Sequence, residues 1–389
     1  MTVQLPDFRL EVYLGEWEFK ARFHLTASDA ESLTIGELLA LGTDADREAF
    51  NSLGLGYAPT WGSDDLRAAI AATYDTVDPH RHVLAFAGAE EGMYWALQEL
   101  AGPDDHAIVT VPNYQSMETL TLRTGAEVSG WALRPEHGWA PDLDELRALI
   151  RPNTTLIAVN FPNNPTGALP DRDTLVALAR LCDEHGIVLF SDEVYRGLEL
   201  DPSRMLPQAC DLSERAISVN VMSKAYGLPG LRVGWLATHD HDLLARLERR
   251  KHYTSICNAG PSEFLATLAL RHGDAIRARN RAIVETNLPV FDAFFARWEE
   301  AFAWEHPQGG CVCFPRYLGG DAGTFCRELL EEAGVVLLPA DIYASALGEV
   351  SGDRFRIGVG RRDPEPALAA MEAFLQRGVD RRAGQARRS

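Results

Sequence analysis

The chain has 389 residues, of which 46% are hydrophobic and 24% are charged, as is typical of a soluble globular protein. Its formal net charge of −19 argues against a nucleic-acid or anionic-membrane surface, and no apolar run is long enough to span a bilayer. The six cysteines lack metal-ligand spacing, and the N-terminal stretch lacks the apolar core of a secretion signal. We therefore expect a cytoplasmic protein with reduced thiols, no metal, no nucleic-acid partner and no membrane contact.

Short apolar runs rich in β-branched residues alternate with helical patterns over most of the chain. Strands are predicted at residues 82–88, 106–112, 154–162, 186–191 and 216–222, and helical patterns at 90–101, 114–125 and 171–186. Continuous apolar strands separated by helices are typical of a mostly parallel sheet that is covered on both faces. We therefore predict an α/β fold for this part of the chain.

A small, polar or aromatic residue follows each predicted strand. These residues are Gly88, Ala89 and Glu90 after the first strand, Tyr114 after the second, Asn164 after the third, Asp192 and Tyr195 after the fourth, and Ser223 and Lys224 after the fifth. Ligands of such sheets bind beyond the carboxyl ends of the strands. We therefore expect these residues to surround one ligand site.

The pattern changes beyond the predicted sheet. Short aromatic or glycine-rich strand candidates occur at 311–320, 334–340 and 354–360, followed by a final helical pattern at 364–378. They predict a smaller α+β domain over 291–389, associated with the N-terminal segment 1–45. A long helix at about 278–302 would connect it to a large domain over 46–290.

Lys224 is one of only three lysines in a chain that has 34 arginines. Arg232 lies eight residues further on, past a Gly-Leu-Pro-Gly turn, and together with a helix N-terminus at Ala89 it would hold a phosphate. A carboxylate that faces a ring nitrogen, with a lysine as Schiff-base partner, matches the binding logic of pyridoxal phosphate.

Four motifs in this chain resemble those of the class I/II aminotransferases, which have fold type I of the pyridoxal-phosphate enzymes. The motifs are FPNNPTG (161–167), SDEVY (191–195), SKAYGLPGLRVG (223–234) and FRIGVG (355–360), and the resemblance runs from about Tyr57 to Arg362. It implies a large domain with a mostly parallel central sheet, a smaller α+β domain, a pyridoxal 5'-phosphate cofactor, an amino-acid substrate and a homodimer with shared active sites.

The resemblance also implies a role for each matched residue. Lys224 would form the Schiff base and move the Cα proton, and Asp192 would pair with the ring nitrogen. Tyr195 and Asn164 would hydrogen-bond the ring oxygen, Tyr114 would stack on the ring, and Gly88, Ala89, Glu90, Ser223 and Arg232 would hold the phosphate. Arg356 would clamp the substrate carboxylate, and Tyr57 would reach the phosphate of the neighbouring subunit.

The chain departs from the family pattern in two places. Val221 stands where many members have Ser or Thr, and the segment 23–38 replaces the usual loop over the substrate. Ser28 and Asp29 in this segment could cap a following helix. Alternatively, an acid of this segment, Asp29 or Glu31, or one of Glu16 and Glu18 just before it, could bind a cationic substrate side chain as a carboxylate–guanidinium pair. The histidines, His24 included, show no pattern and are expected to be structural.

The chain also resembles a smaller group within this fold, the capreomycidine synthase-like cyclases of antibiotic biosynthesis. The shared features include NFPxNP, SKAYGLPGLRVGW and the segments 140–146 and 309–316. This resemblance implies β-elimination and ring closure on a hydroxylated arginine. We expect amino-acid transamination first, with this cyclisation as the alternative. A dehydrogenase is not expected because no G-x-G-x-x-G follows a strand.

Overall fold

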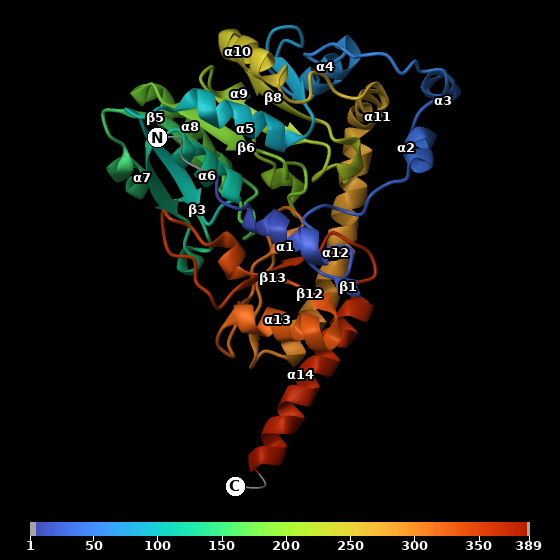
Figure 1. Cartoon of the computed structure of the whole chain (residues 1–389), viewed down its shortest axis with the longest axis vertical. Helices are drawn as coiled ribbons and strands as arrows, with labels where there is room; N and C mark the ends of the chain where they lie inside the picture. The colour runs from blue at the N-terminus through green and yellow to red at the C-terminus, as the bar shows by residue number, and fades with distance from the viewer. Residues whose placement is uncertain (1–4, 387–389) are drawn as a thin grey trace.

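The structure of the chain is a computed structural model that describes residues 5–386, with side chains up to residue 378. A wide part holds the central sheet, and a narrower part tapers towards the C-terminal helix α14 (Glu365–Ala386), as Figure 1 shows. No helix within the described range has the length and apolarity that crossing a membrane would need.

Seven strands form the central sheet. They are β2 (Val83–Phe86), β3 (His106–Val111), β4 (Glu127–Ala132), β5 (Thr154–Asn160), β6 (Val188–Asp192), β7 (Ile217–Val221) and β8 (Gly234–Thr238). The order across the sheet is β2-β8-β7-β6-β5-β3-β4, and among these strands β8 runs antiparallel to both of its neighbours. The predicted α/β fold with a mostly parallel sheet is therefore confirmed.

Alternate residues of β5 explain why the strands are apolar throughout. Leu156 and Ala158 pack on one face of the sheet with α5 (Ala89–Leu100), α6 (Gln115–Arg123) and α10 (His241–Lys251). Ile157 and Val159 pack on the other face with α7 (Leu143–Leu149), α8 (Arg172–His185) and α9 (Ala209–Leu212). A strand covered on both faces needs apolar residues at every position.

Local signals set the limits of the helices that follow the strands. At α8, the side chain of Asp171 accepts the N–H of Thr174 at 2.7 Å, and Gly186 ends the helix with a φ of 68°. An acidic N-cap and a left-handed glycine are standard start and stop residues of a helix. The helical patterns at 90–101, 114–125 and 171–186 thus correspond to α5, α6 and α8 within one or two residues.

The narrower part contains short strands and helices. Its strands are β9 (Phe302–Ala303), β10 (Val312–Cys313), β11 (Arg316–Tyr317), β12 (Val335–Val336), β13 (Leu338–Pro339) and β14 (Phe355–Gly358), and its helix α13 (Ala322–Ala333) precedes α14. The N-terminal segment joins it, because β1 (Phe23–His24) pairs in parallel with β12. Helix α1 (Arg9–Trp17) lies between the two parts in Figure 1.

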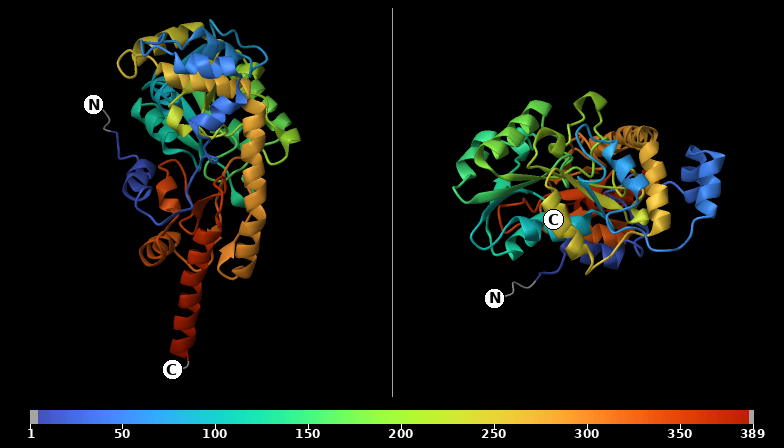
Figure 2. Two further views of the ribbon diagram at one scale, coloured as in Figure 1. Left: turned by 90° about the vertical axis from the view of Figure 1, so that its right-hand side faces the viewer. Right: turned by 90° about the horizontal axis from the view of Figure 1, so that it is seen from above.

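A long helix, α12 (Gly273–Arg297), runs from the wide part into the narrower one, as the left view of Figure 2 shows. Both of its ends lie earlier in the chain than the predicted limits of 278 and 302. The remaining helices are α2 (Ile35–Leu41), α3 (Asp44–Asn51), α4 (Asp64–Ala71) and α11 (Gly260–Arg271). The division into domains at residues 45 and 290 stays a prediction.

Candidate active site

A cavity of about 530 Å³ lies at the carboxyl edge of the sheet, between the two parts of the chain. It is lined by residues that follow β5, β6 and β7, by the N-terminus of α5, by α1, and by segments around β1 and β14. Of the predicted site residues, it contains Ala89, Glu90, Tyr114, Asn164, Asp192, Tyr195, Ser223, Lys224, Arg232, Arg356, Ser28 and Asp29. Its volume is within the usual range of small-molecule sites.

Lys224 follows β7 and projects into this cavity. Its Nζ donates to Ser28 Oγ at 2.7 Å. Burial lowers the pKa of Lys224 below its usual value, and the nearby charge of Asp29 partly opposes that change. A lysine with a lowered pKa is neutral more often, which suits attack on a carbonyl carbon and proton transfer.

The other two lysines lie elsewhere. Lys251 is 0% exposed, and its Nζ donates to Thr60 O and Ala85 O at 2.7 Å each and to Asn258 Oδ1 at 3.0 Å. Lys20 is exposed. Lys224 is therefore the lysine that the fold places in the cavity.

Asp192 is the last residue of β6 and is 4% exposed. Its Oδ1 accepts the N–H of Val194 at 3.1 Å, and burial raises its pKa to about 7, although the charge of Lys224 lowers it. A carboxylate buried with so few partners is stabilised by a cationic ligand. Tyr114 also lines the cavity, and the ring of Phe8 packs edge-on against its ring with the two centroids 5.1 Å apart.

Arg356 and Asn164 form a connected cluster on one side of the cavity. Arg356 is 1% exposed and donates to Asn164 Oδ1 at 3.1 Å and to Thr26 O at 2.7 Å, while its Nε has no partner in the described part of the chain. The hydroxyl of Tyr343 also donates to Asn164 Oδ1, at 3.2 Å. Because both donors bond the amide oxygen of Asn164, they fix the orientation of the amide, and its Nδ2 is the atom available to donate to a ligand.

The N-terminus of α5 and Arg232 form an anion cradle. Gly88 has a φ of 102°, and a Cβ at this position would lie 2.5 Å from Arg232 Nη2. A Cβ on Gly234 would lie 2.5 Å from the backbone N of Ala89. No side chain of the described residues caps α5, so its first N–H groups remain available beside Arg232 and the buried Ser223.

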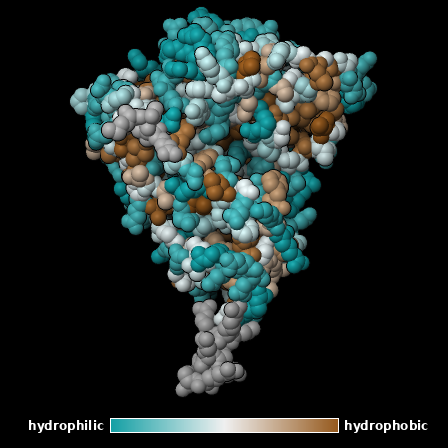
Figure 3. All heavy atoms as spheres, in the orientation of Figure 1, coloured by the Kyte–Doolittle hydropathy of each residue, from teal (hydrophilic) through white to brown (hydrophobic). Residues whose placement is uncertain are grey.

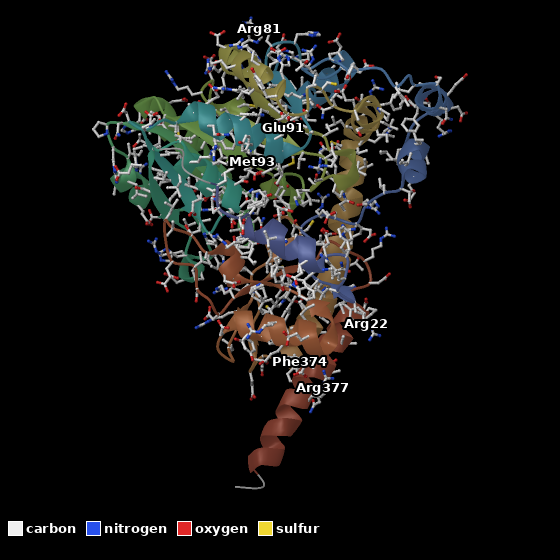
Figure 4. The ribbon with its side chains drawn as sticks, in the orientation of Figure 1. Arg22, Arg81, Glu91, Met93, Phe374 and Arg377 are labelled. Atoms are coloured by element: carbon white, nitrogen blue, oxygen red, sulfur yellow. The ribbon has the colours of Figure 1, made fainter. Side chains whose placement is uncertain are left out.

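Glu91 holds the loop that leads into this cradle. Its Oε2 accepts the N–H of Ala87 at 2.7 Å and the hydroxyl of Ser255 at 3.0 Å. Glu91 and Met93, both on α5, are labelled in Figure 4, and Met93 lines the cavity. Because Glu91 fixes this loop, the short glycine-containing turn holds the N-terminus of α5 accessible to a ligand.

The segment 23–38 is only partly as predicted. The cap of α2 is Thr34, which forms a capping box with Glu37, so the prediction that Ser28 and Asp29 cap this helix is wrong. Both residues line the cavity instead. However, Asp29 Oδ2 already accepts a hydrogen bond from Arg361 at 2.7 Å, so its charge is compensated.

Several cavity residues were not predicted from the sequence. They include Phe8, Leu10, Glu11, Leu14, His24, Thr26, Asn160, Met93 and Arg361, whereas Glu18 was suggested as an acid that could bind substrate. His24 lines the cavity with its Nε2 3.0 Å from Thr26 Oγ1, and burial lowers its pKa. Most of these residues lie in or directly beside α1 and β1, and only the tertiary fold brings those elements to the sheet edge.

Tyr57 lies outside the cavity of its own chain and is 92% exposed. Gly88, which was predicted to bind the cofactor, packs against Arg232 and does not line the cavity.

The cavity fits a phosphorylated pyridine aldehyde such as pyridoxal phosphate. The buried Asp192 can face a protonated ring nitrogen, the cradle suits a phosphate, and Lys224 can bond the aldehyde carbon. The hydroxyl of Tyr195 is buried without a hydrogen-bond partner within the described residues, which leaves it free for a ligand oxygen.

Known proteins agree with this fit. Capreomycidine synthase from Streptomyces vinaceus is 35% identical over 380 residues, covering 95% of this chain and 94% of that protein. Arginine–pyruvate transaminase from Pseudomonas aeruginosa is 36% identical over 306 residues, covering 76% of each. The crystal structure of a PLP-dependent aminotransferase from Streptococcus suis superposes with a TM-score of 0.88 at 33% identity, covering 96% of this chain and 99% of that one.

The family described as aminotransferase class I and II matches residues 33–374, which is most of the chain. Together with the fold and the cavity, this match shows that the chain belongs to the class I and II aminotransferases and is a pyridoxal-phosphate-dependent enzyme.

Proposed function

We propose that this protein binds the carboxylate of an α-amino acid through Arg356 and removes the Cα proton with Lys224. Pyridoxal phosphate, when bound, supplies an aldehyde carbon that captures the substrate amine and a ring that withdraws electrons from Cα. The observation that carries the proposal is that Lys224, Asp192 and Arg356 line one cavity.

Lys224 is suited to move the proton. Its amine is held by Ser28 at 2.7 Å, and its lowered pKa lets it accept a proton from Cα and return it. Asp192 would keep the ring nitrogen protonated, because a buried carboxylate without a compensating cation favours a cationic partner. Tyr195 and the Nδ2 of Asn164 would donate to the ring oxygen, and Tyr114 would stack on the ring.

Arg356 is suited to orient the substrate. Its guanidinium is buried and fixed by two hydrogen bonds, and no carboxylate in the described part of the chain forms an ion pair with it. A buried, unpaired guanidinium binds a carboxylate through two parallel hydrogen bonds. The phosphate would lie on the N–H groups of Ala89 and Glu90, with Ser223 and Arg232 beside it, because the N–H of Gly88 already donates to Phe86 O at 2.8 Å.

Exchange of the Cα proton tests this proposal whichever product forms. The holoenzyme is incubated with L-norleucine or L-arginine in D₂O, and the Cα signal is followed by NMR. Wild-type protein should exchange the proton. Lys224→Ala should not, although Asp192 and Arg356 remain in place. Equal exchange by the two proteins would refute the role of Lys224.

Transamination is the first candidate reaction, supported by the family match over residues 33–374. Lys224 would move the Cα proton, the amino group would pass to an oxo-acid acceptor, and the substrate would leave as a 2-oxo acid. The enzyme is supplied with L-arginine and pyruvate, and the 2-oxo acid is measured by mass spectrometry. A product that forms only with pyruvate, in equal amount with alanine, supports transamination.

Cyclisation is a second candidate, favoured by the similarity to capreomycidine synthase over 95% of this chain. The same Cα electron pair would expel a β-hydroxyl group as water, and a guanidine nitrogen would then close a ring, as in antibiotic biosynthesis. β-Hydroxyarginine supplied without an acceptor would then lose one water with its nitrogen retained. Recovery of unchanged substrate, together with transamination of arginine, would exclude this candidate.

We further propose that the enzyme is a cytoplasmic homodimer in which Tyr57 reaches the partner's phosphate. The exposure of the large apolar side chains Tyr57, Leu55 and Ile35 supports an interface that a second copy would bury. Figure 3 shows apolar side chains gathered over α2 and α11. The described cysteines are all free thiols, which supports a reducing compartment. Light scattering should give a dimer, and Tyr57→Phe should weaken pyridoxal-phosphate binding.

A further inference from the structure

The cavity contains more acids than the proposed chemistry uses. Asp192 is assigned to the ring nitrogen, and Asp29 is paired with Arg361. Glu11, Glu18 and Glu90 also line the cavity, and none of the ion pairs among the described residues involves them. Uncompensated carboxylates in a shared cavity repel each other and favour a cation.

Glu90 combines burial with an unused acceptor. Its Oε1 accepts the hydroxyl of Ser116 on α6, which fixes the direction of the side chain. Its Oε2 is buried and has no hydrogen-bond partner within the described residues. A buried carboxylate oxygen without a donor is costly, so its persistence points to a ligand that donates to it. The backbone N–H of Glu90 is part of the N-terminus of α5, whereas its side chain contacts Ser116 on α6.

Glu11 approaches the same place from α1. Helix α1 is anchored by Arg9, whose backbone N–H donates to Gln115 at 3.0 Å and whose Nε donates to Ile342 O at 3.2 Å. Glu11 is exposed and lines the same cavity, where its charge acts to raise the pKa of both Glu90 and Lys224. Two carboxylates on separate, anchored elements therefore line the cavity that also holds the reactive lysine.

We propose that Glu90 and Glu11 bind the cationic end of the substrate side chain, and that this end is a guanidinium. The inference rests on the proposed function, because it places an amino-acid substrate between Arg356 and this acidic pair. A guanidinium has five N–H donors in a planar fork, so it can donate to two carboxylates at once, whereas an ammonium is a single point charge. The pair disfavours acidic side chains by repulsion.

The acids proposed here to bind the cation, Glu90 and Glu11, differ from Asp29, which the sequence of segment 23–38 suggested. Asp29 lies in the cavity, but Arg361 compensates its charge. Neither Glu90 nor Glu11 forms an ion pair with a described residue, and because burial raises the pKa of Glu90, a cationic ligand would stabilise its charged form. The Asp29–Arg361 pair then carries no net charge, and the cationic end of the substrate lies beside the acids of α1 and α5.

The experiment uses two ligands that lack the α-amino group and therefore undergo no reaction. δ-Guanidinovalerate carries the carboxylate and guanidinium of arginine, and δ-ureidovalerate is its uncharged isostere. Binding of each to the holoenzyme is measured by calorimetry for wild type, Glu90→Gln, Glu11→Gln and Glu16→Gln. Glu16 is the matched control, because it is an acid on α1 that does not line the cavity.

Wild type should bind δ-guanidinovalerate about tenfold to a hundredfold more tightly than δ-ureidovalerate, as expected for one charged hydrogen-bonding pair. Glu90→Gln and Glu11→Gln should each remove most of this preference without changing δ-ureidovalerate binding, and Glu16→Gln should keep it. Equal binding of the two ligands by wild type would overturn the inference, as would full preference in both cavity variants.

The proposed function and the acidic subsite can be tested separately. Cα exchange on norleucine without any guanidinium preference would leave the proposed function standing and remove the acidic subsite. Guanidinium preference without Cα exchange on any amino acid would support the subsite and refute the proposed function.

Discussion

Asp192 gives a quantitative prediction about the protein without its cofactor. Burial raises the pKa of this carboxyl from 3.8 to about 7. An acid with a higher pKa in the folded chain than in the unfolded chain destabilises the fold when it is ionised. This destabilisation is absent below pH 3.8, grows as the pH rises towards 7, and is complete above about pH 7.

Each pKa unit corresponds to about 1.4 kcal/mol, so ionised Asp192 lowers the free energy of unfolding by about 4 kcal/mol at pH 8. Asp192→Asn removes the charge and keeps an oxygen that can accept the N–H of Val194. We expect the cofactor-free variant to be about 4 kcal/mol more stable than cofactor-free wild type at pH 8, and about 2 kcal/mol more stable at pH 5.

Urea unfolding followed by circular dichroism at both pH values measures these differences. Added pyridoxal phosphate should reverse the order at pH 8, because the ring nitrogen compensates the charge only in wild type. Glu193→Gln is the matched control, since burial also raises the pKa of Glu193 to about 7 but its side chain does not line the cavity. It should keep cofactor affinity. A gain in stability from Asp192→Asn that is the same at pH 5 and pH 8 would refute the reasoning.

Three further experiments test the phosphate cradle, the binding of the substrate carboxylate by Arg356, and the Asp29–Arg361 pair. Gly88→Ala puts a Cβ 2.5 Å from Arg232 Nη2 at a positive φ, so cofactor affinity in a fluorescence titration should fall at least about tenfold; unchanged affinity would contradict the cradle. Arg356→Lys keeps the charge but loses the fork, so calorimetry should show about tenfold to a hundredfold weaker δ-ureidovalerate binding with cofactor affinity retained. Asp29→Asn leaves Arg361 unpaired and should weaken δ-guanidinovalerate binding by repulsion. Adding Arg361→Gln to this variant should restore the binding. If the double variant does not regain binding, Asp29 contacts the ligand.

The sheet and its ligand edge could be predicted because local pattern and strand direction determine them. A buried parallel strand such as β5 is apolar at every position, and its carboxyl end must lie at the common edge. Edge strand β4 was missed because most of its residues are partly exposed, so it lacks a continuous apolar run. Strand β8 was missed because it directly follows the glycine-rich turn that carries Arg232.

The acidic side of the cavity could not be predicted because it depends on how distant elements pack. Glu11 is on α1, a helix held over the sheet edge by contacts of Arg9 with residues more than a hundred positions away. The ion pair of Asp29 with Arg361 likewise joins segments that are remote in sequence. A sequence pattern identifies acids near the N-terminus but not which of them a neighbouring arginine compensates.

The scarcity of lysine has a practical consequence for chemical labelling. Lys20 is on the surface, Lys224 is in the cavity, and Lys251 is enclosed by three oxygen acceptors. An amine-reactive reagent followed by peptide mapping would therefore report separately on the surface, the cavity and the interior of the protein. Modification of Lys20 reports on the folded surface, protection of Lys224 reports on cofactor occupancy, and modification of Lys251 reports on unfolding.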